Sequence, residues 1–148
     1  MDKIDISLLK ILQEDARITV SELSKQLALS RPSVAERLHR LQERGIIEGF
    51  SARVSPAALG RNTLLIIQIS DLKIPAQQWE NMIAEEKDVL ECHRVTGHIG
   101  YVIKAAVNGM DGLRALVDRL MNYSNYVNTS VILTSPVSYR LIVPTEES

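Results

Sequence analysis

The segment from Thr19 to Gly45 constrains this chain most, because TVSELSKQLALSRPSVAERLHRLQERG has the pattern of two short helices joined by a tight turn. Thr19 and Glu22 have the spacing of a capping box, which predicts that a helix begins there. Ser30 is a second cap, Pro32 is tolerated in the first turn, and Gly45 offers a left-handed stop. Because only three residues separate the two helices, the helices must pack closely against each other.

The second of these helices is predicted to have two different sides. At about 100° per residue, three apolar residues share one side and are expected to be core: Val34, Leu38 and Leu41. Another side, which we call the arginine face, carries Ser33, Arg37, Arg40 and Arg44. Short hydroxyls and guanidinium groups opposite a buried stripe suit a helix that lies in the major groove of DNA.

The alternative for this helix is an ordinary solvated amphipathic surface. The short turn argues against that alternative, as do Glu36 and Glu43, which lie off the arginine face and are expected to leave it unneutralised. The net charge of the whole chain is −1, but five basic residues face two acidic ones between Lys25 and Arg44. Affinity for phosphates without regard to sequence should then be modest, and binding should depend on several copies of the domain.

Composition narrows the class of protein further. A hydrophobic content of 45% supports a core, and no apolar run approaches the roughly 20 residues that span a bilayer. The N-terminus, with Asp2 and Lys3, lacks the layout of a signal peptide. The single cysteine, Cys92, can form no internal disulfide and has no partner at metal-ligand spacing. We therefore expect a cytoplasmic, nucleoid-associated protein with no metal, cofactor or membrane partner.

The chain is expected to fold as two modules. A first helix from about residue 4 to 15, the two helices above and a strand pair, or wing, around Gly49 would form a winged helix-turn-helix over residues 1–54. Residues 55–61, which contain the sequence PAALG, are predicted to be a linker. The residues predicted to contact DNA, at base edges or phosphates, are Arg17, Thr19, Ser30, Arg31, Ser33, Arg37, Arg40, Arg44 and Arg53.

Residues 62–148 show a different pattern. Strands are predicted at 64–70, 89–97, 101–107 and 129–134, with a helix after Pro75 and another that carries Leu113 to Met121. The order βαββαβ is that of a ferredoxin-like sandwich, with both helices on one face of an antiparallel sheet. Because the second face also needs cover, we expect at least a homodimer. The composition of residues 144–148 predicts a tail without fixed structure.

Taken in order, these segments resemble the leucine-responsive/asparagine-operon regulators, the Lrp/AsnC or feast/famine family. The resemblance rests on residues 5–50, the linker PAALG, the VTG…Y loop, and the last helix followed by TSVILTS. It implies an α+β transcriptional regulator whose C-terminal domains assemble dimers into octamers or related polymers around which DNA wraps. It also implies an amino-acid effector bound between dimers, near the loop that joins the second and third strands.

This loop departs from the family pattern. Members that bind amino acids carry Gly-x-x-Asp before an aromatic or aliphatic residue, whereas this chain has Gly97, His98, Ile99, Gly100 and Tyr101. An ammonium group buried without an acceptor costs about 1–3 kcal/mol or more. The candidate effector residues are Gly97, His98, Gly100 and Tyr101, and they predict no amino-acid ligand or a different one. His98 could replace the lost polar group, but a solvent-exposed loop histidine is the simpler expectation.

Two other classes of function are open. Relatives with the same layout include tetrapyrrole-binding decarboxylases that rely on histidines, but this chain has only His39, His93 and His98. It has no Ser/His/Asp grouping, no paired catalytic carboxylates and no glycine-rich phosphate loop, so we expect no enzyme. A ligand-sensing module that acts through protein partners would tolerate neutralisation of Arg37 and Arg40. The sequence favours a DNA-binding regulator.

Overall fold

The computed structural model describes residues 1–144, which divide into two units. The first consists of Met1–Arg53 together with the segment that begins at Val137, and the second is Val54–Pro136. Residues 137–144 thus lie with the first unit, although the sequence places them in the predicted C-terminal domain of residues 62–148, and that domain boundary stays a prediction. The tail expected at residues 144–148 lies, apart from Pro144, outside the described residues.

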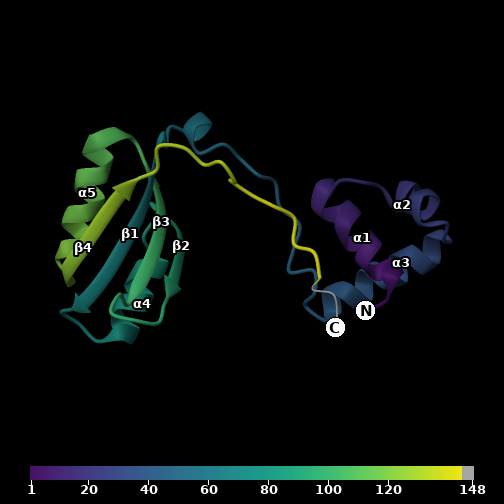
Figure 1. Ribbon diagram of the computed structural model, residues 1–148, viewed down its shortest axis with the longest axis horizontal. Helices are drawn as coiled ribbons and strands as arrows, with labels where there is room; N and C mark the ends of the chain where they lie inside the picture. The colour runs from purple at the N-terminus through teal and green to yellow at the C-terminus, as the bar shows by residue number, and fades with distance from the viewer. Residues whose placement is uncertain (145–148) are drawn as a thin grey trace. The chain divides into compact units, whose positions relative to one another are not determined.

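Three helices form the body of the first unit: α1 (Lys3–Glu14), α2 (Val20–Leu27) and α3 (Arg31–Glu43) (Figure 1). Their shared core has five buried apolar side chains, Leu8, Leu12, Leu23, Val34 and Leu41, with Leu27, Leu29 and Leu38 packed around it. This is the core that the helical periodicity predicts.

The caps that the sequence predicts are present at both helices of the turn motif. The Thr19 hydroxyl accepts from the N–H of Glu22 at 3.1 Å, and the Glu22 carboxylate accepts from the N–H of Thr19 at 3.0 Å. The hydroxyl of Ser30 accepts from the N–H of Ser33, and Gly45 follows α3 at a φ of 67°. The two helices are therefore held at their ends by local hydrogen bonds.

The turn between α2 and α3 depends on a residue in the left-handed region. Ala28 has a φ of 52° and a ψ of 42°, which ends α2 and turns the chain toward α3. The hydroxyl of Ser24 donates to the carbonyl of Leu29, so a side chain of α2 fixes the far side of the turn. The start of α3 is thereby placed by α2.

The predicted wing is absent from residues 46–54. After Gly45 the chain makes a short bend and then runs as irregular backbone to Pro56, where the short 3₁₀ helix η1 (Ala57–Leu59) begins the linker region. The apolar residues that suggested paired strands have different surroundings: Ile47 packs on the core of the first unit, whereas Phe50 and Val54 are exposed. A single extended segment without a hydrogen-bonded neighbour forms no strand pair.

Residues 137–144, which we call the docking segment, are held by two side chains of the first unit. The amide of Gln13 in α1 donates to the carbonyl of Ile142 and accepts from its N–H, both at 2.9 Å. The guanidinium carbon of Arg53 lies 3.1 Å from the centroid of the Tyr139 ring, as in a cation–π contact. The Gln13 side chain thus pairs with both the N–H and the carbonyl of Ile142, as the backbone of a neighbouring strand would.

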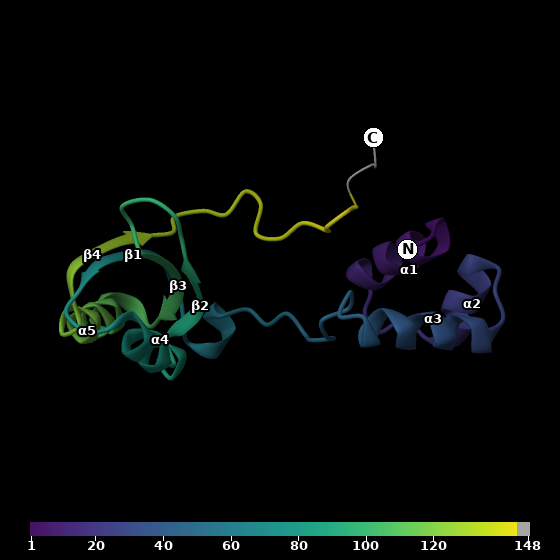
Figure 2. The same ribbon diagram turned by 90° about the horizontal axis from the view of Figure 1, so that it is seen from below.

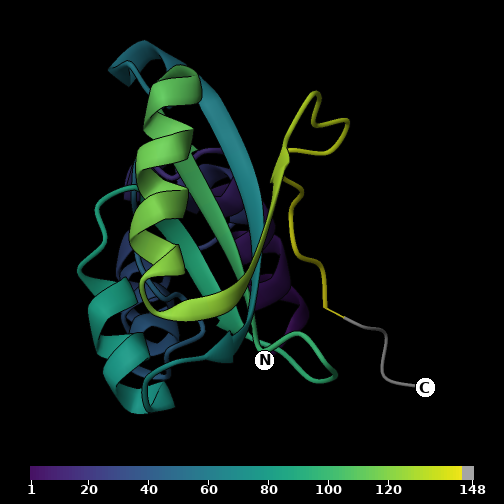
Figure 3. The same ribbon diagram turned by 90° about the vertical axis from the view of Figure 1, so that its left-hand side faces the viewer.

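The second unit is a four-stranded antiparallel sheet with two helices. The strands are β1 (Thr63–Leu72), β2 (Val89–Arg94), β3 (Tyr101–Val107) and β4 (Ser124–Val131), and their spatial order is β2-β3-β1-β4. The helices α4 (Ala76–Ala84) and α5 (Gly109–Met121) lie together on one face of the sheet (Figures 2 and 3). The ferredoxin-like order βαββαβ is confirmed. β2 ends three residues earlier than predicted, and β4 begins at Ser124 instead of 129.

Alternation along the strands explains which face is covered. Leu65, Ile67 and Ile69 of β1 are fully buried beneath α4 and α5, together with Trp79 and Leu116 from those helices. The opposite face contains apolar residues that are only half-buried: Leu64, Ile66 and Val102. No helix within residues 1–144 combines the length and the apolar character needed to cross a membrane.

Candidate nucleic-acid interface

The first turn of α3 gathers three of the residues predicted to contact DNA. Ser30 is the N-cap, Arg31 follows at the first helical position, and Ser33 is half-buried in the same turn. Both Ser30 and Arg31 are exposed, and the free N–H groups of a helix N-terminus favour an anion. This end of the helix can therefore approach both a phosphate and a base edge.

Further along α3 the buried and exposed sides separate as predicted. Val34 and Leu41 are fully buried, and Leu38 packs beside them. Arg40 and Arg44 are exposed, whereas the side chain of Arg37 retains only 19% of its full exposure. One arginine of the predicted DNA face is therefore largely covered.

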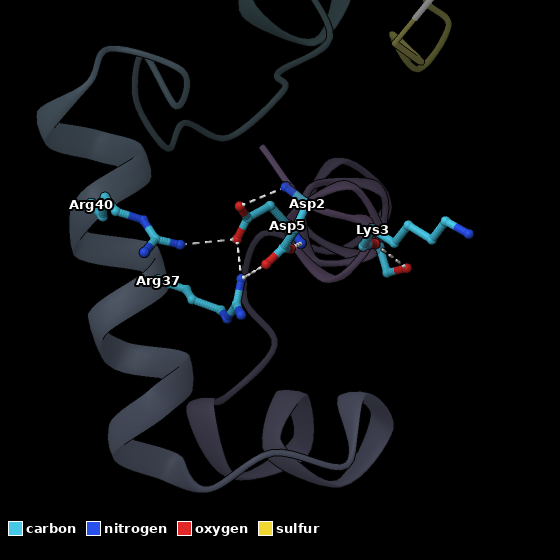
Figure 4. Close-up of polar contacts among 6 residues, drawn as sticks. Asp2, Lys3, Asp5, Arg37 and Arg40 are labelled. Carbon is cyan, nitrogen blue, oxygen red and sulfur yellow. Dashed lines mark hydrogen bonds and ion pairs between the residues drawn. The ribbon is translucent and has the colours of Figure 1, made fainter. Parts of the chain in front are cut away.

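Two carboxylates at the start of α1 cover Arg37, one from its N-cap and one from its first turn (Figure 4). Its Nη1 donates to Asp2 Oδ2 and to Asp5 Oδ1, each at 2.7 Å, and the Nη2 of Arg40 lies 3.5 Å from the same oxygen of Asp5. The expectation of an unneutralised arginine face is wrong, because the neutralising acids come from α1 and not from α3. We call Asp2 and Asp5 the acidic pair.

The acidic pair is also the N-terminal cap of α1. Asp2 Oδ1 accepts from the N–H of Asp5 at 2.8 Å, and Asp5 Oδ2 accepts from the N–H of Asp2 at 3.2 Å. Each carboxylate thus gives one oxygen to the helix cap and the other to Arg37. The cap of the first helix and the position of an arginine on the third are parts of one hydrogen-bonded network.

The electrostatics of this network favour the charged forms. The pKa of Asp2 is lowered by the N–H of Asp5 and then by Arg37. Burial acts to raise the pKa of Asp5, whose side chain is 4% exposed, but the hydrogen bonds from Arg37 and from Asp2 outweigh burial and lower it. The two carboxylates in turn raise the pKa of Arg37. All three groups are ionised at neutral pH.

The acidic pair was missed from the sequence, although one signal was available. Asp5 lies three residues before Leu8 and seven before Leu12, on the apolar side of α1, where an acid is expected only with a partner. Aspartates three residues apart at a helix start also match a reciprocal cap. Neither pattern names the partner, because Arg37 is 32 residues from Asp5 along the chain.

The remaining predicted DNA contacts have different surroundings. Arg17 is exposed just before α2, where its N–H donates to Asp15. The hydroxyl of Thr19 is occupied by the capping box with Glu22, so its first role is structural. Arg53 lies over the ring of Tyr139, in irregular chain instead of a wing.

The predicted effector loop is held by backbone hydrogen bonds, one within the loop and one to β1. Gly100 donates its N–H to the carbonyl of Ile69 at 2.9 Å and accepts from the N–H of Val95 at 3.0 Å. His98 is exposed, as expected for a loop histidine, and Gly97 has a φ of 104°. Within residues 1–144, both hydrogen bonds of Gly100 are therefore made to backbone groups.

Tyr101, the last residue of this candidate set, faces the covered side of the sheet. Its ring packs 4.3 Å from Trp79, centroid to centroid, and its hydroxyl donates to Glu80 at 2.6 Å. Burial and the hydrogen bond to Glu80 raise its pKa. The Tyr101 side chain thus packs against α4 and is hydrogen-bonded to it.

The histidines raised by the enzyme alternative lie at separate exposed positions. His39 pairs with Glu43 on α3, and His93 pairs with Glu91 on β2. Across residues 1–144, no group of three or more His, Cys, Asp or Glu side chains is arranged to hold a metal ion.

Comparison with known proteins identifies the two units. Residues 1–42 match the AsnC-type helix-turn-helix domain, and residues 65–142 match the Lrp/AsnC ligand binding domain. The chain belongs to the Lrp/AsnC family of transcriptional regulators. The family resemblance seen in the sequence is therefore confirmed, with its DNA-binding helix-turn-helix and its ligand-binding domain.

Individual Lrp/AsnC proteins align with this chain over most of its length. The leucine-responsive regulatory protein of Escherichia coli (strain K12) is 33% identical over 120 residues, which cover 79% of this chain and 73% of that protein. The uncharacterized HTH-type transcriptional regulator YezC of Bacillus subtilis (strain 168) is 32% identical over 135 residues, covering 91% and 95%. The feast or famine regulatory protein Rv3291c from M. tuberculosis, solved in complex with L-methionine, is 31% identical with a TM-score of 0.88, covering 97% and 99%.

Proposed function

We propose that this Lrp/AsnC regulator binds preferred DNA sequences by inserting α3 into the major groove. The observation that carries the proposal is the capped α2–turn–α3 unit, in which the first turn of α3 is exposed while Val34 and Leu41 anchor its other side. Ser30, Arg31 and Ser33 would lie nearest the base edges, as the leading residues of a recognition helix do. Arg40 and Arg44 would reach further along the groove or to flanking phosphates.

Arg17, Thr19 and Arg53 are proposed as backbone contacts at the margins of this interface. Arg17 is exposed at the start of the turn motif, and Thr19 adds a helix N-terminus close by. Arg53 would act from the irregular segment while its guanidinium remains over Tyr139. Contacts of this kind add affinity and register but little sequence information.

We further propose that the protein works as a homodimer assembled into octamers around which DNA wraps. The half-buried apolar residues on the uncovered face of the sheet support pairing with a second copy, because an antiparallel sheet packed on one side needs cover on the other. Several recognition helices on one DNA molecule would raise affinity beyond what the modest local charge provides.

The amino-acid response is proposed to be lost or altered. Rv3291c and the Neisseria meningitidis regulator NMB0573 were solved with methionine, so relatives of this chain bind amino acids. Here Gly100 offers no carboxylate, and the hydroxyl of Tyr101 is bound to Glu80. A ligand at the loop of Gly97, His98, Gly100 and Tyr101 would meet mainly backbone groups. We propose a non-enzymatic regulator that acts in the cytoplasm on the nucleoid.

The test combines solution mass with DNA binding. Light scattering measures the assembly, and gel-shift titration on a long DNA fragment, with and without a panel of amino acids, measures cooperativity and response. The proposal predicts an octamer-sized particle, cooperative shifts and no effect of the panel. The variant Arg31→Ala should weaken DNA binding at unchanged mass, whereas its control Arg114→Ala, on α5, should leave both unchanged. A small particle, or an Arg31→Ala variant that binds like the wild type, would contradict it.

A further inference from the structure

We propose that Asp5 is a positioning residue for DNA recognition, which fixes Arg37 and draws Arg40 toward the same point. In this role Asp5 would lower the affinity for DNA of any sequence and increase the discrimination between sequences. This inference rests on the proposed function, because it concerns how α3 reads DNA. It assigns an active role to a buried carboxylate of α1 that does not itself reach the DNA face.

The position of Asp5 is fixed independently of the arginines. Its side chain is 4% exposed in α1, and its Oδ2 is held by the N–H of Asp2 at 3.2 Å. Only Oδ1 is directed to α3, where it receives Arg37 at 2.7 Å and Arg40 at 3.5 Å (Figure 4). The carboxylate is therefore a rigid acceptor whose place is set by the cap of α1.

The same contacts limit what Arg37 can offer to DNA. A guanidinium has five N–H donors, and both of those on Nη1 are used by Asp2 and Asp5. The Nε and Nη2 of Arg37 have no hydrogen-bond partner among residues 1–144, and these atoms form the fork that binds a phosphate or a guanine edge with two parallel bonds. Pinning Nη1 fixes the plane of that fork before DNA arrives.

The acidic pair also cancels charge at the centre of α3. Two carboxylates face two guanidinium groups, so Arg37 adds little to the counterion release that drives binding to any sequence. A freed Arg37 would gain that attraction and lose its orientation. Asp5 thus lowers non-specific binding and raises specificity through one carboxylate.

A purely structural clamp between α1 and α3 makes a different prediction. Loss of such a clamp would lower stability and weaken all DNA binding together. The positioning role predicts opposite signs, with tighter non-specific binding and poorer discrimination in a protein that remains folded.

The experiment compares wild type, Asp5→Asn and the control Glu36→Gln. Each protein selects bound duplexes from a random-sequence library, and each is titrated with one fixed non-selected duplex over a range of salt concentrations. For Asp5→Asn we expect a salt slope steeper by about one unit, several-fold tighter binding of the fixed duplex at low salt, and weaker sequence enrichment. Glu36→Gln also removes one negative charge, on α3 itself, and should change affinity while leaving enrichment intact.

Each outcome decides the proposal. Wild-type enrichment in folded Asp5→Asn, or a parallel loss of both kinds of binding, overturns it. If circular dichroism shows that Asp5→Asn is unfolded, Asp2→Asn decides instead, because Asp2 is 53% exposed and asparagine is a good N-cap. Asp2→Asn should shift the slope and the enrichment in the same directions, and wild-type behaviour of that variant overturns the proposal. A wild type that enriches no sequence would instead contradict the proposed function.

Discussion

Replacement of Leu41 by alanine should unfold the helix-turn-helix unit while the ferredoxin-like domain stays folded. Leu41 is fully buried in α3, in a core of five apolar side chains that is separate from the core around the sheet. The two cores share no residue, so the loss of one removes no packing contact from the other. DNA binding should disappear because α3 loses its support, not because a base contact is removed.

The expected magnitude is comparable to the stability of the whole unit. A buried leucine truncated to alanine costs about 3–5 kcal/mol, from the lost transfer free energy and the cavity left behind. A unit of about 53 residues, at about 0.05–0.15 kcal/mol per residue, has a free energy of unfolding of about 3–8 kcal/mol. The substitution therefore removes most or all of the free energy of unfolding of the first unit.

Trp79 makes the two units separately observable. It is the single tryptophan of the chain and is fully buried in the second unit, so its fluorescence reports on that unit alone. Far-ultraviolet circular dichroism follows the helices of both units. In a urea titration of Leu41→Ala, we expect the α1–α3 signal to be lost at low denaturant while the tryptophan transition stays at the wild-type midpoint.

The matched control is Leu116→Ala, which truncates an equally buried leucine of α5. It should move the tryptophan transition and leave the helix-turn-helix signal in place. If Leu41→Ala moves the fluorescence midpoint as far as the dichroism midpoint, the two units unfold as one, and the reasoning from separate cores is refuted.

Three further predictions follow from particular contacts. The pKa values of Asp2 and Asp5 lie below the ordinary 3.8, so their stabilisation of the first unit should be complete above that pH and lost as the pH falls through the lower, folded values. Dichroism melts at neutral and acid pH would show this loss, and the double variant Asp2→Asn/Asp5→Asn, which lacks both titrations, should lose less stability over the same range. Gln13→Ala should release the docking segment and speed tryptic cleavage after Arg140, as seen by mass spectrometry, whereas an equal rate in wild type and variant would show that the amide holds nothing. Gly100→Asp should fold normally, because a Cβ there would lie 3.4 Å from the carbonyl of Ile69, and calorimetry should detect tighter amino-acid binding in this variant than in the wild type.

Local signals in the sequence were sufficient for most of the fold. The capping box of Thr19 and Glu22, the cap at Ser30 and the stop at Gly45 are interactions between residues a few positions apart, so the pattern contains both partners. The buried strand β3 was located at its observed ends because every residue from Tyr101 to Val107 except Lys104 is apolar. Such features depend on backbone geometry that a short stretch of sequence specifies.

The features that the sequence did not predict depend on partners far away in the chain. The covering of Arg37 needs Asp2 and Asp5, and the docking segment needs Gln13, which lies 129 residues from Ile142. The wing failed for a related reason, since apolar spacing between Ile46 and Val54 does not supply a second strand. A surface charge pattern read from one helix omits the charges that another helix brings to it.

The docking segment has a consequence for the order in which the protein is made. Synthesis produces α1 to α3 first and the whole of residues 54–136 next, and only then the residue whose backbone pairs with Gln13. A nascent chain that has reached Pro136 contains both hydrophobic cores, so its DNA-binding helices can fold before the docking segment exists. A stop codon placed there would yield a folded product whose two units are joined only by the linker, because the docking segment would be absent. Premature termination at that point would therefore remove the contacts of Gln13 and Arg53 with the docking segment while leaving both hydrophobic cores complete.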